Sequence, residues 1–572
     1  MKVTDYIVQF LKGKGVTSVF ELSGGMIMQL IDSFHLDGTI KLISIHHEQS
    51  ASFAADAVGR MTGIPGVAMA TSGPGATNLI TGIGSCYFDS SPAIFITGQV
   101  NTHEQKGDKN IRQLGFQETD IVSIVKSITK YAVKITSVDQ VQKVFENAFD
   151  IATSGRPGPV LIDIPMDIFR ATIEVNKENT KSKEIVAANI PDEIIQQLLT
   201  DLKKSERPLI LAGAGIRASG AYNIFLQLIE KLNVPVVSSL LAIDVLPFDN
   251  ALHVGMIGTY GNRWANISLY NSDFLLVLGS RLDIKQTGAD TKSFKGDKII
   301  YHVDCEAGEI NNRVTGCVSI NVDLKDFINK LKSKINDKLV SKKEWEDSIN
   351  ALKEKWPDTK ELQNIKGINP NYFMQALSIA GADIGVYVAD VGQHQMWAAQ
   401  SLRLNKDQRF ITSGGMGAMG FALPAAIGVS ITDATKPTCV IAGDAGFQLN
   451  IQELQTVVRN QLPIKIVIIN NQCQGMTRQF QESYFSGRYQ STIWGYSVPD
   501  FEKIANAYGI QSATIMEEKE IPEALKKMNE TKGPFLLDVR IDTFANAYPK
   551  MAFGLPISEM EPYARPMDME ST

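Results

Sequence analysis

The stretch GDAGFQLNIQELQTVVRNQLPIKIVIINNQ, residues 443–472, decides the fold class of this chain. An apolar run at 438–442 precedes it and a β-branched run at 464–469 lies within it, so both predict buried strands. A tight turn at 443–446 and helical spacing over 449–459 would connect them. The stretch therefore predicts a strand–helix–strand crossover between parallel strands.

Polar side chains follow both of these predicted strands. Asp444 comes after the first strand, and Asn470 and Asn471 come after the second. The carboxyl ends of parallel strands are where open α/β sheets bind ligands. A carboxylate and an amide oxygen suit Mg²⁺ or Ca²⁺, and such a cation commonly shares its shell with phosphates. The free amides of the turn would help to hold those phosphates.

Bulk composition limits the class of protein. At 572 residues the chain is too long for one core, which favours three or four domains. A net charge of −6 does not favour binding to nucleic acid or to an anionic membrane. No apolar run is long enough to span a bilayer, and the start MKVTDYIVQFLKGKG has no signal-peptide core, so we expect a cytoplasmic protein. The five cysteines contain no C-x-x-C pair, which disfavours a disulfide scaffold and structural zinc.

Three α/β blocks are expected, at residues 1–175, 190–335 and 367–550, followed by a tail at 551–572. Residues 176–193 are expected to form a linker, and the charged stretch 333–366 a solvated helical connector. The last residues, EPYARPMDMEST, are expected to be mobile or laid on the surface. Strands alternate with helices throughout, so the fold class is α/β, with three doubly wound parallel-sheet domains.

The first block carries two candidate motifs. HHEQSASFAADAVGR places Glu48 at the start of an Ala-rich helix, where any carboxylate complements the helix dipole. Zinc is a weak alternative for this motif, because there is no H-E-x-x-H. TSGPGATNL predicts a turn at 73–75, after which Thr77 and Asn78 open a helix. The backbone amides of this turn would face an anion or a polar ring; alternatively, the turn is only a connecting loop.

The other blocks carry glycine-rich motifs. LAGAGIRASG, at 211–220, nearly matches the dinucleotide pattern, but the acid expected about twenty residues later is missing, which disfavours a standard NAD site. Polar strand ends such as GSRLDIKQTG and HVDCEAGEINN would line a groove for an extended ligand, or belong to a vestigial domain with an empty groove. In the third block, VADVGQHQMWAAQ precedes TSGGMGAMGFALPAAIG, whose glycines permit close backbone approach to a ligand.

In their order and spacing, these motifs resemble the thiamine diphosphate enzymes, and in particular the acetohydroxyacid (acetolactate) synthase branch. The resemblance covers roughly residues 1–550. It implies a pyrimidine-binding domain over 1–175, a central FAD-binding-like domain over 190–335 and a diphosphate-binding domain over 367–550. The flavin in that family is largely structural, since the net reaction involves no redox change.

The resemblance also assigns the cofactor-binding residues. Asp444, the Asn471 side chain and the backbone carbonyl of Cys473 resemble the Mg²⁺ ligands, and Met419 resembles the wedge that bends thiamine. Glu48 resembles the carboxylate that exchanges a proton with the aminopyrimidine. Further expected cofactor contacts are Gly25, Pro74, Asn78, Gly392, Gln393, His394, Gly417, Gly443, Ala445, Gly446 and Met476, with Gly213, Gly215, Arg281, Asp304 and Asp323 in the middle block.

The chain departs from the synthase pattern mainly on the acceptor side. Lys285 stands where the synthases carry an arginine for the second substrate's carboxylate; lysine keeps the charge but loses the bidentate fork. Phe480 occupies a tryptophan position tied to acceptor choice, and Met166 replaces a lysine. Ala445 replaces the third glycine of the diphosphate motif, whereas Gln117, like Phe116 before it, matches the family's pocket. These changes fit either neutral drift or a changed acceptor.

The resulting prediction is a thiamine diphosphate- and Mg²⁺-dependent carboligase that decarboxylates pyruvate and transfers the two-carbon unit to an acceptor carbonyl. The acceptor is a second 2-keto acid or, alternatively, a nucleotide-linked keto sugar. A catalytically silent binding subunit is the third possibility, disfavoured by intact Glu48, Asp444 and Asn471. Because Glu48 and Asp444 lie in different blocks, the family's dimer-interface site implies a homodimer or homotetramer, with a possible small regulatory subunit.

Overall fold

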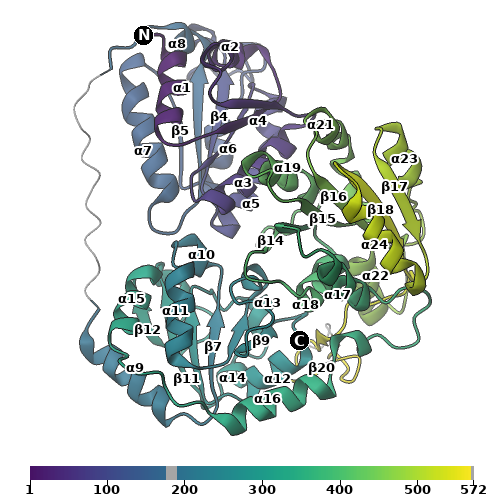
Figure 1. Cartoon of the computed structure of the whole chain (residues 1–572). Helices are drawn as coiled ribbons and strands as arrows, with labels where there is room; N and C mark the ends of the chain where they lie inside the picture. The colour runs from purple at the N-terminus through teal and green to yellow at the C-terminus, as the bar shows by residue number, and fades with distance from the viewer. Residues whose placement is uncertain (176–189, 569–572) are drawn as a thin grey trace.

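The computed structural model describes residues 1–175 and 190–568 (Figure 1). The strands form three parallel six-stranded sheets and one short antiparallel pair. The predicted fold class, α/β with three doubly wound parallel sheets, is confirmed. Residues 176–189, in the predicted linker, lie outside the described residues. In the described part of the chain, no helix is long and apolar enough to cross a bilayer.

The first sheet has the strand order β2-β1-β3-β4-β6-β5. Its inner strands β3, β4 and β6 are buried along their whole length, because helices cover both faces. The strands are β1 (Ser18–Glu21), β2 (Lys41–Ser44), β3 (Gly66–Ala70), β4 (Ala93–Gln99), β5 (Tyr131–Lys134) and β6 (Pro159–Pro165). The helices are α1 (Val3–Gly13), α2 (Met28–Asp37), α3 (Glu48–Thr62), α4 (Pro74–Asn78), α5 (Ile80–Asp89), α6 (Ile121–Val125), α7 (Val141–Thr153) and α8 (Met166–Arg170), with 3₁₀ turns η1 (Gly25–Ile27), η2 (Thr102–Glu104), η3 (Lys126–Ile128) and η4 (Val138–Gln140).

The second sheet has the order β12-β11-β10-β7-β8-β9. Its strands are β7 (Pro208–Ala212), β8 (Val236–Ser238), β9 (His253–Met256), β10 (Phe274–Leu278), β11 (Ile299–Asp304) and β12 (Val318–Asn321). Its helices are α9 (Asp192–Lys204), α10 (Gly215–Ala218), α11 (Tyr222–Leu232), α12 (Arg263–Asn271), α13 (Ile284–Thr287), α14 (Thr291–Lys295), α15 (Leu324–Ser333) and α16 (Lys343–Lys355), with η5 (Leu240–Ala242) and η6 (Ala307–Glu309). The expected solvated connector is wrong in part, since α16 buries Trp345 and Ile349 against this sheet's core.

The third sheet has the order β14-β13-β15-β16-β18-β17. Its strands are β13 (Val386–Ala389), β14 (Arg409–Thr412), β15 (Thr438–Gly443), β16 (Ile464–Asn470), β17 (Gln511–Ile515) and β18 (Phe535–Arg540). Its helices are α17 (Pro370–Ala380), α18 (Gln393–Ser401), α19 (Ala422–Thr432), α20 (Asp444–Gln448), α21 (Leu454–Arg459), α22 (Gly475–Tyr484), α23 (Phe501–Ala507) and α24 (Ile521–Glu530), with η7 (Asp358–Lys360), η8 (Ile451–Glu453) and η9 (Glu518–Glu520).

The crossover quoted first is present, with two local corrections. β15 and β16 are parallel neighbours, with Gly443 opposite Ile469. The predicted tight turn at 443–446 is wrong, because α20 begins directly at Asp444. The predicted continuous helix over 449–459 is also wrong. The chain is interrupted at Asn450, whose side-chain amide donates to the Gly420 carbonyl at 2.8 Å, before η8 and α21 follow.

Helices α3 and α19 join the first and third blocks into one core (Figure 1). Both helices are rich in alanine and glycine, so their backbones approach closely: a Cβ placed on Gly428 would lie 2.2 Å from the Ala54 carbonyl oxygen. Phe53 and Phe421 pack edge to face at 5.3 Å between centroids. The start of α3, which carries Glu48, is thereby fixed against the third block.

The C-terminal segment returns to the second block. β19 (Lys550–Met551) pairs with β20 (Met560–Glu561), and both methionines pack in the core around β10. Residues 562–568 are mostly exposed, as expected for a tail laid on the surface, whereas Glu561 is buried. The predicted tail at 551–572 is therefore anchored through Met551, Met560 and Glu561, and only its described end at 562–568 is laid on the surface.

Candidate active site

Glu48 lies buried at the first position of α3. The Asn78 side-chain amide donates to Glu48 Oε2 at 2.9 Å. A Cβ placed on Gly75 would lie 3.2 Å from Glu48 Oε1, so this glycine leaves room for the carboxylate. The helix beside it begins at Pro74, not at Thr77 as predicted, because proline suits the first turn of a helix. The fold thus brings together Glu48, Pro74 and Asn78.

Gln117 and Gly25 belong to the same region. Gln117 has a left-handed backbone (φ 64°), and its carbonyl accepts from Ser72 Oγ at 2.7 Å. Gly25 opens η1, in which the Met26 N–H donates to Thr71 Oγ1 at 3.4 Å. Both residues therefore flank the turn that precedes Pro74.

Two carboxylates that the sequence did not reveal support this region. Asp163 is buried and accepts from Gln99 Nε2 at 3.0 Å, and Gln99 in turn contacts Ser72 Oγ at 3.1 Å. Burial raises the pKa of Asp163 to about 7. Glu118 accepts backbone N–H groups from Lys106 (2.7 Å), Leu114 (2.9 Å) and Gly115 (3.4 Å). Although burial acts in the opposite direction, these N–H groups hold the pKa of Glu118 below its usual value.

Asp444 and Asn471 meet at the carboxyl edge of the third sheet. Asp444 is buried and its Oδ1 accepts from the Tyr496 hydroxyl at 3.1 Å, while Oδ2 accepts no hydrogen bond from any described residue. Burial raises the pKa of Asp444 to about 7. Asn471 Nδ2 donates to Gln393 Oε1 at 3.1 Å, and Asn471 Oδ1 accepts from the Cys473 N–H at 3.3 Å. A buried carboxylate oxygen without a partner fits a hard divalent cation such as Mg²⁺.

Glycines let the backbone close around this edge. A Cβ on Gly443 would lie 2.8 Å from His394 Nδ1, and one on Gly446 would lie 2.7 Å from Asp390 Oδ1. Gly392, with φ 155°, directly precedes Gln393 and His394 at the start of α18. Burial lowers the pKa of His394 to about 3, so its ring is neutral. Ala445 is half-buried in the first turn of α20.

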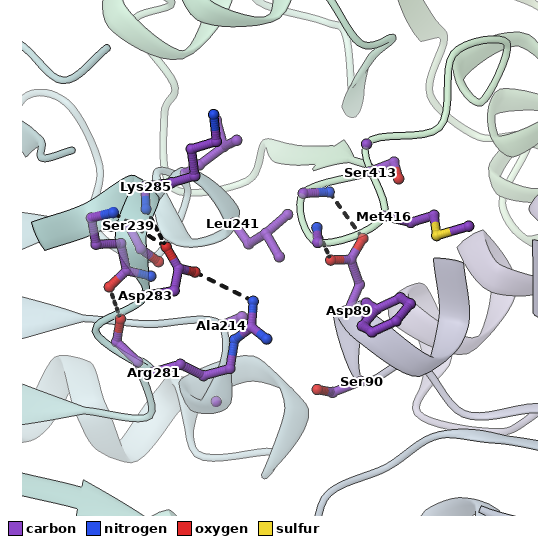
Figure 2. Close-up of a pocket in the computed structure, with 18 of the residues that line it drawn as sticks. Asp89, Ser90, Ala214, Ser239, Leu241, Arg281, Asp283, Lys285, Ser413 and Met416 are labelled. Carbon is purple, nitrogen blue, oxygen red and sulfur yellow. Dashed lines mark hydrogen bonds and ion pairs between the residues drawn. The ribbon is translucent and has the colours of Figure 1, made fainter. Parts of the chain in front are cut away.

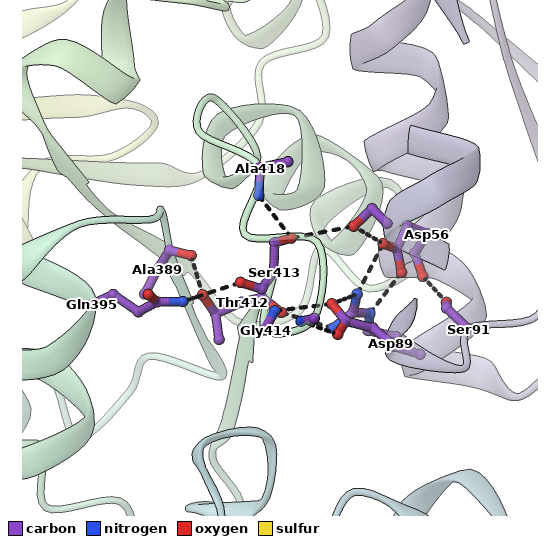
Figure 3. A network of polar contacts seen from close by, with 12 residues as sticks. Asp56, Asp89, Ser91, Ala389, Gln395, Thr412, Ser413, Gly414 and Ala418 are labelled. Atoms are coloured by element: carbon purple, nitrogen blue, oxygen red, sulfur yellow. Dashed lines mark hydrogen bonds and ion pairs between the residues drawn. The ribbon is translucent and has the colours of Figure 1, made fainter. Parts of the chain in front are cut away.

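The loop after β14, which carries Gly417 and Met419, is fixed at both ends by buried carboxylates. Figure 3 shows Asp89 at the first of these ends, beside Gly414. Asp89 accepts from the Gly414 N–H at 3.0 Å and the Gly415 N–H at 2.6 Å. Asp390 accepts from the Gly420 N–H at 2.9 Å. The sequence analysis did not identify Asp89 as a functional residue. Its position as a charged residue inside the apolar run SCYFDSSPAIFITG could have marked it as a buried carboxylate.

Arg60 donates a hydrogen bond to the Asp89 carboxylate and holds it in place. Its guanidinium contacts Asp56 at 2.6 Å, Asp89 at 3.0 Å and the Thr412 carbonyl at 2.8 Å. The network therefore ties α3 and α5 of the first block to β14 of the third.

A cavity of about 720 Å³ lies where all three blocks meet (Figure 2). Figure 2 shows Asp89 from the first block, Arg281 and Lys285 from the second, and Met416 from the third around it. The predicted residues that line it are Gly215, Arg281, Lys285, Asp304, Asp323, Gly417, Met476 and Phe480. Its volume is that of a site for a cofactor-sized ligand. Asp304, the last residue of β11, and Asp323, the N-cap of α15, offer carboxylates to ribose hydroxyls, which fits a flavin nucleotide.

Other predicted residues lie away from this cavity. Glu48, Gln117 and Asp444 do not line it, and no hydrogen bond within the described residues joins Glu48 to Asp444. Met419 is half-buried, and Met416 is the methionine of that loop that lines the cavity. Gly213 serves packing: a Cβ there would lie 2.0 Å from the Gly279 carbonyl oxygen. The Cys473 thiol donates to the Thr543 carbonyl at 3.4 Å, and burial raises its pKa to about 12.

Comparison with known proteins identifies the family. Thiamine pyrophosphate enzyme N-terminal TPP-binding, central and C-terminal TPP-binding domains match residues 1–124, 195–331 and 390–539. The acetolactate synthase large subunit of Lactococcus lactis subsp. lactis is 37% identical over 97% of this chain and 95% of its own. The acetolactate synthase isozyme 2 large subunit of Escherichia coli K12 is 34% identical over 98% of this chain and 99% of its own. The chain therefore belongs to the acetolactate synthase large-subunit family of thiamine pyrophosphate enzymes.

Proposed function

We propose that this enzyme decarboxylates pyruvate and transfers the resulting two-carbon unit to a second 2-keto acid, as an acetolactate synthase. The observation that carries the proposal is the buried Asp444 carboxylate, whose Oδ2 lacks a partner among the described residues beside Asn471. The matched relatives are acetolactate synthases over nearly their full length, so a nucleotide-linked keto sugar is not the favoured acceptor.

Bound thiamine diphosphate supplies the electron sink for decarboxylation. Asp444 and Asn471, with the Cys473 carbonyl, would hold Mg²⁺ and through it the diphosphate. Glu48 would hold a proton at the pyrimidine nitrogen, and Asn78, 2.9 Å from Oε2, keeps that carboxylate oriented. Lys285 would orient the acceptor's carboxylate, and FAD would occupy the cavity between the blocks.

We further propose that the site is completed by a second copy of the chain. Glu48 and Asp444 must act on one cofactor, yet no described contact joins them in one chain. Large apolar side chains next to both regions are exposed: Phe116, beside Gln117, is 79% exposed, and Leu449, after α20, is 53% exposed. A homotetramer, a regulatory subunit and a cytoplasmic location stay predictions from the sequence.

The test is product analysis with pyruvate, thiamine diphosphate, Mg²⁺ and FAD. The expected product is acetolactate, with activity lost in Glu48→Gln and Asp444→Asn and retained in the exposed control Asp433→Asn. Mixing the two inactive variants tests the shared site. Statistical hybrid dimers would leave about a quarter of all sites intact, so activity should return on subunit exchange. Absence of acetolactate from the wild type would refute the activity, and absence of complementation would refute the shared site.

A further inference from the structure

One end of the central cavity is built from a row of ring and charged side chains. The Phe480 and Tyr484 rings contact each other in a tilted arrangement, with 4.8 Å between centroids and 50° between planes. Lys550 Nζ lies 5.4 Å from the Tyr484 ring centroid and 2.8 Å from Glu561 Oε1. Phe480 and Lys550 both line the cavity. These side chains therefore form a row from Phe480, the position that the sequence analysis tied to acceptor choice, through Tyr484 to the buried Lys550 of the C-terminal segment.

Backbone hydrogen bonds place Lys550 on the same wall as Lys285. The Thr259 N–H donates to the Lys285 carbonyl at 2.7 Å, and the Met551 N–H donates to the Thr259 carbonyl at 2.7 Å. The Thr259 backbone thus links the segments that carry Lys285 and Lys550, and both lysines line the cavity. A lysine side chain is long and flexible, so both ammonium groups can reach one small ligand in this cavity. In residues 1–175 and 190–568, Lys285 Nζ has no hydrogen bond or ion pair of its own.

Lys550 and Glu561 form a buried ion pair. Their side chains are only 10% and 7% exposed. A buried ion pair contributes little net stability compared with apolar residues of the same size, because both charges lose their hydration. Stability alone therefore does not account for a lysine at the wall of a cavity. Glu561 accepts one hydrogen bond from the Lys550 ammonium and leaves its remaining N–H donors for another acceptor.

We propose that Lys550 is a specificity-determining residue, a second cation that binds the carboxylate of the acceptor 2-keto acid together with Lys285. The inference rests on the proposed carboligase function. Each ammonium is a single point charge, so two lysines together supply the two contacts that one bidentate arginine would make with a carboxylate. Glu561 is the positioning residue that holds Lys550 in the cavity wall. The ligand class is a 2-keto acid, and neutral carbonyl compounds would gain nothing from Lys550.

The test compares two acceptors that differ only in the carboxylate, 2-ketobutyrate and propanal, at saturating pyruvate. Lys550→Met should raise the KM for 2-ketobutyrate about tenfold, leave the KM for propanal within twofold, and be rescued by Lys550→Arg. Glu561→Gln retains the cation, so its KM for 2-ketobutyrate should stay within threefold of wild type.

The donor half is followed separately, by pyruvate-dependent reduction of a dye that oxidises the two-carbon intermediate. Normal dye reduction with an unchanged KM for 2-ketobutyrate in Lys550→Met would overturn this inference alone. Equal changes for both acceptors, or the same loss in Glu561→Gln as in Lys550→Met, would assign the pair a structural role and also overturn it. No dye reduction by the wild type would instead overturn the proposed function, and this inference with it.

Discussion

Arg60→Met tests how the first and third blocks are held together. The Arg60 side chain is 13% exposed, and the side chains of Asp56 and Asp89 are fully buried. Methionine would leave two buried carboxylates without their shared cation. Removing one partner of a buried pair typically costs 3–5 kcal/mol. Asp89 keeps the Gly414 and Gly415 N–H groups, so we expect a loss of about 4 kcal/mol and not more.

The measurement is urea unfolding followed by circular dichroism. Arg60→Lys keeps the charge but loses the two-pronged contact with Asp56, so an intermediate loss of roughly 1–2 kcal/mol is expected. Lys343→Met is the matched control, because its ion pair with Asp347 is on the surface, and no measurable change is expected. A loss below about 1 kcal/mol for Arg60→Met, or identical losses for methionine and lysine, would refute the reasoning.

Three further predictions concern single side chains. Burial raises the pKa of Asp163 to about 7, so the native state holds a proton that the unfolded chain releases near pH 4. The stability that this proton contributes is lost as pH rises through 7. Relative to Asp163→Asn, the free energy of unfolding should fall by about 3 kcal/mol between pH 5 and pH 8, and an unchanged difference would contradict this. Glu118→Gln should speed tryptic cleavage within residues 106–112 severalfold, because one amide oxygen cannot accept both backbone hydrogen bonds that the two carboxylate oxygens accept. Unchanged cleavage would show that Glu118 does not hold this loop in place. Gly213→Ala should lower the melting temperature, because its Cβ would meet the Gly279 carbonyl at 2.0 Å, whereas Gly308→Ala, with open space around it, should not; equal melting temperatures would argue against the close packing.

Local patterns were sufficient for the fold class and for the sheet edge at which Asp444 and Asn471 lie. Apolar and β-branched runs are short-range signals, and they correctly predicted β15 and β16. Parallel strands joined by a helix end at the same sheet edge, so the order along the chain already placed Asp444 near Asn471. Helix starts were less accurate: Pro74 and Asp444 begin helices where turns were expected.

The partners of the buried charges could not be predicted from the sequence. Arg60 and Thr412 are 352 positions apart, and Asp89 and Gly414 are 325 apart. Lys550 and Glu561 are close in sequence, but their burial depends on packing of the C-terminal segment against the second block.

The sequence by itself determined the three parallel sheets and the edge at which polar residues gather, because hydrophobic periodicity and strand order are encoded in neighbouring residues. Only the tertiary structure decided which carboxylates are paired, which oxygen of Asp444 lacks a described partner, and which lysines share a cavity wall. The physical reason is that burial and pairing arise when distant elements pack, and no local pattern specifies the neighbour that a side chain will meet.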